Sequence, residues 1–167
     1  MITLGAQYYR PPFPDSRYWD DDLRHMADAG LNTVQLWVLW GWVEPAPGEW
    51  IFDDYDRLVE LAHKHGLGVV LSAIAEIQPY WIHRQVPGSE MITNMGHRVI
   101  SSNRRECHFG ITPGGCTDHP GVWHHMTEFF TQVVTRYRSA PHLRGWDAWN
   151  ELRWNVQADG LVCYCPY

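Results

Sequence analysis

The sequence predicts an α/β fold with a parallel sheet, and three observations support this fold class. Strand-like and helix-like stretches alternate along the 167 residues in the order β-α-β-α-β-α-β. The second predicted strand is apolar on both faces from Val34 onward, apart from Gln35, which suits a parallel strand covered on both sides. Polar and aromatic residues follow the predicted strands, where α/β barrels place their functional side chains. We therefore predict a (β/α)8 TIM barrel, of which the chain supplies about the first four βα units.

A doubly wound sheet would fit the same order of elements. Its nucleotide-binding form carries a Gly-rich turn after the first strand. Here the first predicted strand ends in Tyr8-Tyr9-Arg10, followed by two prolines. The barrel is therefore the preferred interpretation, although a whole barrel typically takes about 250 residues.

The first predicted strand covers residues 2–8, which are apolar and β-prone. A helix follows, because Asp15 or Ser16 can accept hydrogen bonds from its first N–H groups and Gly30 can close it. Residues 32–39 form the second predicted strand.

A turn-rich loop over residues 41–50 leads into the second predicted helix. Asp53 or Asp54 can cap this helix, which ends at Gly66. Residues 67–74, with their run of branched apolar side chains, form the third predicted strand.

Residues 78–118 show no regular period, and a loop of that length in a compact domain is usually functional. The next helix lies between Pro120 and Pro141. It is predicted by apolar side chains that step by three and four, namely Trp123, Met126, Phe130, Val133 and Tyr137. The fourth predicted strand covers residues 143–149.

Composition narrows the possible functions. The net charge is −6 and the two signs are interspersed, so neither nucleic acid nor an anionic membrane is an expected partner. No apolar run approaches the roughly 18 residues of a membrane span. The N-terminus lacks the basic and apolar regions of a signal peptide, so we expect a cytoplasmic protein. Ten Trp and eight Tyr residues favour an aromatic-lined cleft.

The fourth predicted strand delivers Asn150 and Glu151 at its C-terminal end. Many sugar-cleaving barrels place their acid/base carboxylate in this position, and retaining glycosidases need two carboxyl groups about 5–5.5 Å apart. Glu151 is the candidate acid/base, with an ordinary loop glutamate as the alternative. Asn150 can bond the sugar 2-hydroxyl, or else its own backbone. Glu76, at the end of the third strand, is expected in the cleft but not as the nucleophile.

Two aromatic residues at strand ends, Tyr8 and Trp40, are candidates for contact with a sugar, the alternative being that they pack the loops. Four cysteines lie in loop-like sequence, Cys107, Cys116, Cys163 and Cys165. Four thiolates can close a tetrahedral zinc site. Free thiols or a disulfide such as Cys107–Cys163 remain alternatives.

Several motifs resemble a known family. The stretch from Glu44-Pro-Ala-Pro-Gly48 to Leu58 resembles the second βα unit of clan A glycoside hydrolases, and Asn150-Glu151 resembles their acid/base motif. Within the clan, the chain most resembles the β-galactosidases of glycoside hydrolase family 42. The segments Arg104-Arg105-Glu106-Cys107 and Cys163-Tyr164-Cys165 carry this resemblance, which covers essentially the whole chain.

The resemblance implies that residues 1–167 are the N-terminal part of an incomplete TIM-barrel catalytic domain. It implies an enzyme that releases β-D-galactosyl residues from β-galactoside oligosaccharides, with Glu151 as acid/base and the nucleophile on strand seven, beyond this chain. Arg104 would lie at the base of the subsite that holds the cleaved sugar. The cysteines would bind a structural zinc, with Cys116 or a later residue as fourth ligand. The remainder of the barrel is an implied partner, and the full protein is expected to be a homotrimer.

Two alternatives of other classes remain at this stage. The chain could be a non-catalytic carbohydrate-binding protein on a half-barrel, or a zinc-stabilised scaffold whose aromatic residues only fill a core. The missing nucleophile is the best argument for the first of these alternatives.

Overall fold

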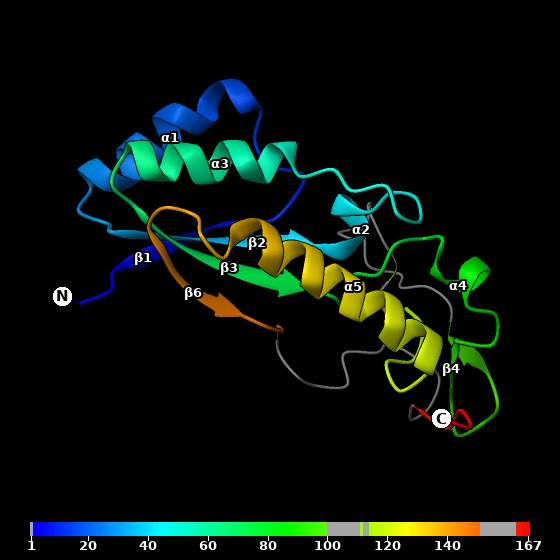
Figure 1. The fold of residues 1–167 in the computed structure, drawn as a ribbon. Helices are drawn as coiled ribbons and strands as arrows, with labels where there is room; N and C mark the ends of the chain where they lie inside the picture. Colours follow the sequence, from blue (N-terminus) through cyan, green and yellow to red (C-terminus); the bar gives the residue numbers. More distant parts are fainter. Residues whose placement is uncertain (1, 100–110, 112–113, 151–162) are drawn as a thin grey trace. The chain divides into compact units, whose positions relative to one another are not determined.

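The computed structural model describes residues 2–99, 111, 114–150 and 163–167, and Figure 1 shows their fold. The predicted alternation of strands and helices is confirmed. The main elements are β1 (Gly5–Tyr9), α1 (Trp19–Asp28), β2 (Thr33–Leu39), α3 (Asp53–Lys64), β3 (Gly68–Ile74), α5 (Pro120–Tyr137) and β6 (Leu143–Asp147). Shorter elements are the 3-10 helix η1 (Ser16–Tyr18), α2 (Trp40–Val43), α4 (Ile82–Gln85), β4 (Met91–Ile92) and β5 (Arg98–Val99).

The chain divides into two compact units. Unit 1 contains Met1–Val38, Phe52–Ala73 and Val133–Ala148, and unit 2 contains Leu39–Ile51, Ile74–Gln132 and Trp149–Tyr167. Unit 1 therefore contains β1, β6, most of β2 and β3, and the helices α1 and α3. Unit 2 holds the segments that continue the chain after β2, β3 and β6.

Unit 1 is built on a sheet with the strand order β1-β2-β3-β6. Strand β1 pairs in parallel with β2, and β3 pairs in parallel with β6. Helices α1 and α3 lie side by side over one face of this sheet (Figure 1). This arrangement is the parallel sheet with alternating helices that a partial α/β barrel requires.

Helical periodicity explains how α1 and α3 pack in unit 1. Each helix buries residues spaced by three or four, which form one apolar stripe. These buried residues include Trp19 and Leu23 in α1, and Tyr55, Leu58 and Leu61 in α3. The hydroxyl of Tyr55 also donates a hydrogen bond to the backbone carbonyl of Trp37 at 2.7 Å, which fixes α3 against strand β2.

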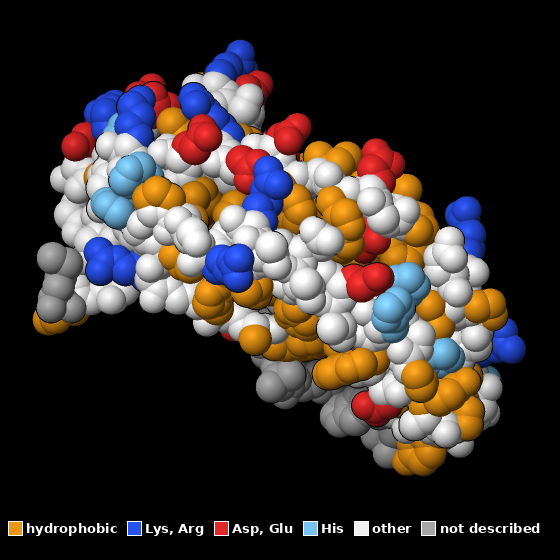
Figure 2. Space-filling view, in the orientation of Figure 1, with side chains coloured by type: hydrophobic (Ala, Val, Ile, Leu, Met, Phe, Trp, Pro, Cys, Tyr) orange, Lys and Arg blue, Asp and Glu red, His pale blue; other side chains and the backbone are white. Residues whose placement is uncertain are grey.

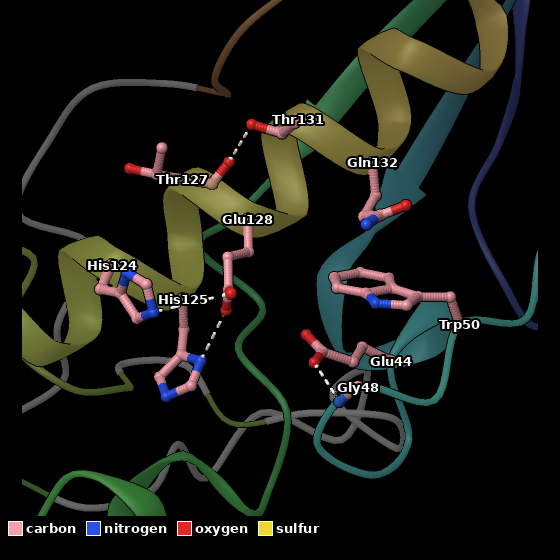
Figure 3. Close-up of a pocket in the computed structure, with 9 residues that line it drawn as sticks. All are labelled: Glu44, Gly48, Trp50, His124, His125, Thr127, Glu128, Thr131 and Gln132. Atoms are coloured by element: carbon pink, nitrogen blue, oxygen red, sulfur yellow. Dashed lines mark hydrogen bonds and ion pairs between the residues drawn. The ribbon is translucent and has the colours of Figure 1, made fainter.

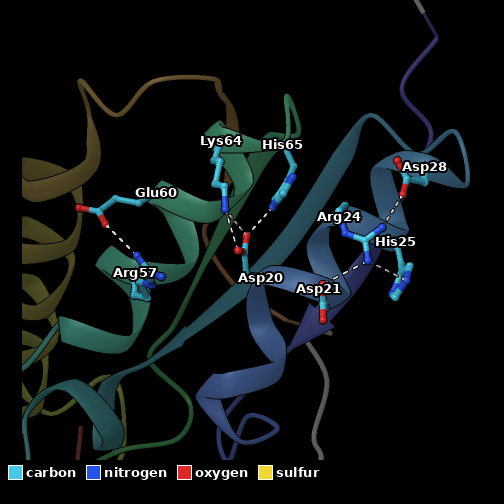
Figure 4. A network of polar contacts seen from close by, with 9 residues as sticks. All are labelled: Asp20, Asp21, Arg24, His25, Asp28, Arg57, Glu60, Lys64 and His65. Atoms are coloured by element: carbon cyan, nitrogen blue, oxygen red, sulfur yellow. Dashed lines mark hydrogen bonds and ion pairs between the residues drawn. The ribbon is translucent and has the colours of Figure 1, made fainter.

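Ion pairs join the exposed sides of the same two helices (Figure 4). Asp20 of α1 accepts hydrogen bonds from Lys64 at 2.6 and 2.8 Å and contacts the ring of His65 at 2.6 Å. Within α1, Arg24 donates to Asp21 at 3.1 Å. Side chains of both charge signs are mixed over α1 and α3 (Figure 2), as the sequence predicted.

A row of polar side chains crosses all four strands of unit 1. Gln7 of β1 donates to Gln35 of β2 at 3.0 Å. The amide of Gln35 in turn donates to Ser72 of β3 at 2.7 Å and to Asp147 of β6 at 3.3 Å. Strand β6 is therefore tied to β2 by a side-chain hydrogen bond and to β3 by its backbone ladder.

Unit 2 contains structure where the sequence predicted an irregular loop. Strands β4 and β5 pair antiparallel, with Met91 opposite Val99 and Ile92 opposite Arg98. The N–H of Tyr164 donates to the carbonyl of Ile92 at 2.8 Å, which brings the end of the chain to this hairpin. Strands of two residues have no detectable period, so residue patterns could not predict them.

Two details of the predicted helices differ from the structure. Neither Asp53 nor Asp54 is the N-cap of α3: the N-cap is Phe52, which makes no side-chain capping bond, and both aspartates lie in the first turn. In α5, Trp123 is 59% exposed, whereas Val122 and Phe129 are fully buried. Among the described residues, no helix is both long and apolar enough to span a bilayer.

Candidate active site and cysteine cluster

Two polar side chains that follow strands meet in unit 2. Glu76 comes soon after β3 and Asn150 soon after β6, and the Asn150 amide Nδ2 donates to Glu76 Oε1 at 3.3 Å. Both residues are partly buried. The sequence placed Glu76 in the cleft, but it did not predict this contact. Glu151, the predicted acid/base, is the next residue after Asn150 and lies outside the described residues, as does Arg104.

Gln78 fixes the segment that carries Glu76. Its side chain is 2% exposed, donates to the carbonyl of Gly115 at 3.0 Å and accepts from the N–H of Gly115 at 2.7 Å. Its backbone exchanges two hydrogen bonds with Ile111, at 2.7 and 3.2 Å. A side chain at Gly114 would collide with Gln78, because its Cβ would lie 2.3 Å from Gln78 Oε1. Glycine at this position thus permits the close approach.

Glu44, the first residue of the Pro-rich motif, is a buried carboxylate with 2% exposure. Its Oε2 accepts from the indole N–H of Trp40 at 2.6 Å, and its Oε1 accepts from the N–H of Gly48 at 2.9 Å. The indole of Trp81 donates to the Glu44 backbone carbonyl at 2.9 Å. Burial raises the pKa of Glu44, while the hydrogen bonds from Gly48 and Trp40 oppose that rise. The motif is therefore folded around this carboxylate.

A cavity of about 430 Å³ opens beside Glu44, in unit 2. Figure 3 shows His125 and Glu128 extending from α5 on one side, with Glu44 and Trp50 on the other. His125 Nδ1 lies 3.1 Å from Glu128 Oε2. The lining residues are Glu44, Gly48, Trp50, His124, His125, Thr127, Glu128, Thr131 and Gln132. Of the nine predicted site residues, the six that the structure describes do not line this cavity.

Three of the four predicted zinc ligands come together in unit 2. The sulfur atoms of Cys116, Cys163 and Cys165 all lie within 4.8 Å of one another, and none of the three forms a disulfide. Thiolates on one zinc ion lie roughly 3.8 Å apart, given Zn–S bonds of about 2.3 Å in a tetrahedron. Small side-chain adjustments would bring these sulfurs to that spacing. Cys107 lies outside the described residues.

Backbone hydrogen bonds hold this cluster in place. The N–H of Cys116 donates to the Ser89 carbonyl at 2.6 Å. The sulfur of Cys163 accepts from the N–H groups of Ile92 and Cys165, each at 3.4 Å. Burial raises the pKa of Cys116 to about 12. Burial acts in the same direction on Cys163, but the hydrogen bonds that it accepts lower its pKa overall.

Trp40 does not present its ring to a cleft in unit 2. It is fully buried, stacks on Phe129 with ring centroids 5.8 Å apart, and meets Trp81 edge-on at 6.2 Å. Its N–H is used by Glu44. Protein side chains therefore occupy the ring faces that we expected a sugar to use, and we do not carry Trp40 forward as a sugar platform.

Tyr8 is likewise engaged in packing, in this case within unit 1. Its hydroxyl donates to Asp22 of α1 at 2.5 Å, and its ring stacks on Phe13 at 6.3 Å. Burial, followed by the hydrogen bond to Asp22, raises the pKa of Tyr8 well above its usual value. At the same strand end, the register of β1 shifts between Gln7 and Tyr9, and the Tyr9 ring lies against Trp37 at 4.7 Å.

The parallel sheet, the alternating helices and the polar residues after the strands define an α/β-barrel protein. The family model for β-galactosidases of glycoside hydrolase family 42 matches residues 8–167. The chain belongs to this family, which confirms the resemblance seen in the sequence.

Individual β-galactosidases are similar in sequence to this chain over nearly its whole length. The chain is 28% identical to β-galactosidase BgaB of Geobacillus sp. over 165 residues, which are 98% of this chain and 23% of that protein. It is also 28% identical to a β-galactosidase of Thermus thermophilus over 164 residues, or 98% of this chain and 24% of that protein. The chain thus spans about a quarter of the length of these relatives.

Solved structures support the barrel fold. The β-galactosidase of Halorubrum lacusprofundi superposes with a TM-score of 0.77 at 27% identity, covering 90% of this chain and 21% of that one. The β-galactosidase of Bacillus circulans gives a TM-score of 0.76 at 20% identity, covering 97% of this chain and 22% of that one. The predicted fold class, a TIM barrel represented in part, is confirmed.

Proposed function

We propose that the protein containing this chain is a retaining glycoside hydrolase that releases terminal β-D-galactosyl residues, with Glu151 as its acid/base. Membership of the family supports the reaction class, since the relatives are named β-galactosidases. The contact between Asn150 and Glu76 supports the location, because it joins two polar side chains that follow strands, and Asn150 directly precedes Glu151 in the sequence.

Glu151 performs two proton transfers in this proposal. In the first step it protonates the glycosidic oxygen of the leaving group while a second carboxylate attacks the anomeric carbon. In the second step it removes a proton from the water that hydrolyses the glycosyl-enzyme intermediate. The attacking carboxylate comes from the remainder of the barrel, outside residues 1–167.

Asn150 and Arg104 bind the reacting parts in this proposal. The amide of Asn150 contacts the sugar 2-hydroxyl, an interaction that strengthens in the transition state. Arg104 reaches the base of the subsite for the cleaved sugar and orients the attacking carboxylate by charge-assisted hydrogen bonds.

Cys116, Cys163 and Cys165 would hold a structural zinc, with Cys107 or a residue beyond Tyr167 as the fourth ligand. The close approach of the three sulfur atoms supports this assignment. Such an ion stabilises the loops that carry its ligands and takes no part in the sugar chemistry.

The remainder of the barrel is the first partner in this proposal. Residues 1–167 supply about the first four βα units of the catalytic domain. In the four-stranded sheet β1 and β6 are the outer strands, and pairing with further strands would satisfy their exposed backbone groups. The family resemblance further suggests a homotrimer of the full protein.

The stereochemistry of the product tests this proposal. Proton NMR of the complete protein acting on an aryl β-galactoside should detect β-galactose before mutarotation produces the α-anomer. Initial release of α-galactose would contradict a retaining mechanism. Cleavage of aryl β-glucosides or α-arabinosides without cleavage of β-galactosides would contradict the galactosyl specificity.

A further inference from the structure

We propose that Glu76 is a positioning residue, whose carboxylate fixes the orientation of the Asn150 amide in the active site. This inference rests on the proposed function and extends it to a residue outside the acid/base motif. The observation that carries it is the hydrogen bond from Asn150 Nδ2 to Glu76 Oε1 at 3.3 Å.

The chemistry of the pair determines which way the amide faces. An ionised carboxylate only accepts hydrogen bonds, whereas an amide has a donor end and an acceptor end of nearly equal size. Only the donor end of Asn150 can face Glu76. The second N–H proton and Oδ1 of Asn150 then point in defined directions, ready to contact a sugar hydroxyl. Without the carboxylate, a half-turn of the amide would exchange donor and acceptor.

The backbone on both sides of Glu76 is held firmly, so its carboxylate is a suitable reference point. Ala75 is fully buried and Ile77 is 6% exposed. The carbonyl of Ile77 accepts from the N–H of Gly41 at 2.9 Å, and Gln78 is clamped to Gly115 by two side-chain hydrogen bonds. A group that must orient a catalytic contact works best on a support of this kind.

The position of Glu76 also explains why it acts through Asn150. Glu76 follows β3 and Asn150 follows β6, and these strands are direct neighbours in the sheet. The parallel pairing of Leu71 with Trp146 and of Ser72 with Asp147 brings the two strand ends to the same edge. The hydrogen bond therefore links the chain segments that directly follow two neighbouring strands.

A double-mutant cycle in the complete protein tests the proposal. The variants are Glu76→Ala, Asn150→Ala and the double variant, assayed on an aryl β-galactoside and on its 2-deoxy analogue. Glu76→Ala should lower kcat on the first substrate about tenfold, the effect of roughly 1.4 kcal/mol, with little change in KM. It should have almost no effect on the 2-deoxy analogue, which lacks the hydroxyl that Asn150 contacts.

Two comparisons decide the outcome. On the Asn150→Ala background, Glu76→Ala should cost nothing further, because the residue that it positions is gone. If the losses of kcat in the two single variants multiply in the double variant, the proposal is overturned. An equal loss of kcat on both substrates would also overturn it. Glu49→Gln is the matched control, since it removes one negative charge from an exposed position in the same unit, and it should retain full activity.

These measurements distinguish failure of the proposed function from failure of the role of Glu76. Wild-type protein that cleaves no β-galactoside would overturn the proposed function, and this inference with it. If the wild-type protein is active but the two substitutions lower kcat independently of each other, only the role of Glu76 is overturned. Thermal unfolding of each variant checks that a loss of kcat does not come from a loss of fold.

Discussion

The carboxylate of Glu44 accepts a hydrogen bond from the indole N–H of Trp40 at 2.6 Å, and both side chains are buried. The other oxygen of Glu44 accepts from the N–H of Gly48 at 2.9 Å. A family motif that begins with Glu-Pro therefore has a physical explanation in this chain. The acid satisfies the indole N–H of Trp40, which burial would otherwise leave unpaired, and it holds the N–H of Gly48 in the exposed turn.

Glu44→Gln should loosen this loop. The amide group of a glutamine would face the N–H of Trp40 or of Gly48, and a donor cannot accept a hydrogen bond from either of them. An unsatisfied donor costs about 1–3 kcal/mol where it is buried, as Trp40 is. Hydrogen exchange of the Gly48 amide should accelerate by about tenfold or more as a result. Glu49→Gln, at an exposed site in the same loop, is the control and should leave that amide unchanged. Equal exchange in both variants would show that Glu44 does not hold the loop.

The Asp20 cluster predicts a specific pH dependence of stability. The hydrogen bond from Lys64, followed by that from His65, lowers the pKa of Asp20 from 3.8 to about 2. A carboxyl group whose pKa is lower in the folded state stabilises that state above its unfolded pKa. This stabilisation should disappear as the pH falls from 3.8 to about 2.

Asp20→Asn measures that contribution. The variant should be less stable than wild type at pH 6, and the difference should shrink to nothing near pH 2. Glu60→Gln, which removes an exposed charge 4.0 Å from Arg57, is a control on the same face. Parallel pH profiles for wild type and Asp20→Asn would contradict the assignment. The measurement is the pH dependence of the urea midpoint.

Metal analysis tests the cysteine cluster. The complete protein, purified without chelators, added metal or reductant, should contain about one zinc per chain. Cys116→Ser should abolish binding, because it removes one of the three sulfurs that lie within 4.8 Å of one another. Cys107→Ser should do so only if Cys107 is the fourth ligand. A metal content near zero in folded wild-type protein would exclude a structural zinc.

The long elements could be predicted from the sequence because they carry their own signals. Strand β2 is apolar from Val34 onward apart from Gln35. The apolar steps of α5 predicted the bounds of that helix closely. The face of α5 was less predictable. Trp123 fits the predicted stripe but is exposed, while Phe129, which is not part of that stripe, is fully buried. Which aromatic ring is buried depends on partners that are distant in the sequence, such as Trp40.

The candidate site was predictable only in part, for a similar reason. The strand order placed Glu76 and Asn150 at strand ends, but their contact depends on which strands are neighbours. The sequence alone predicted that the cysteines share one site, but it did not show how they meet. In the structure, the N–H of Cys116 bonds to Ser89 and the sulfur of Cys163 accepts from the N–H of Ile92 in β4, and the two sulfurs lie within 4.8 Å of each other. Strands of two residues gave no pattern from which that region could be predicted.

Kinetics of Glu151→Gln in the complete protein test the central claim most directly. A general acid matters most when the leaving group is poor, because a good leaving group departs without protonation. The variant should lose about 100-fold or more in kcat/KM on an alkyl β-galactoside or lactose. It should lose much less in glycosylation of the enzyme by a dinitrophenyl β-galactoside, and added azide should accelerate turnover by replacing water. Unchanged turnover of the poor substrate would contradict Glu151 as the acid/base.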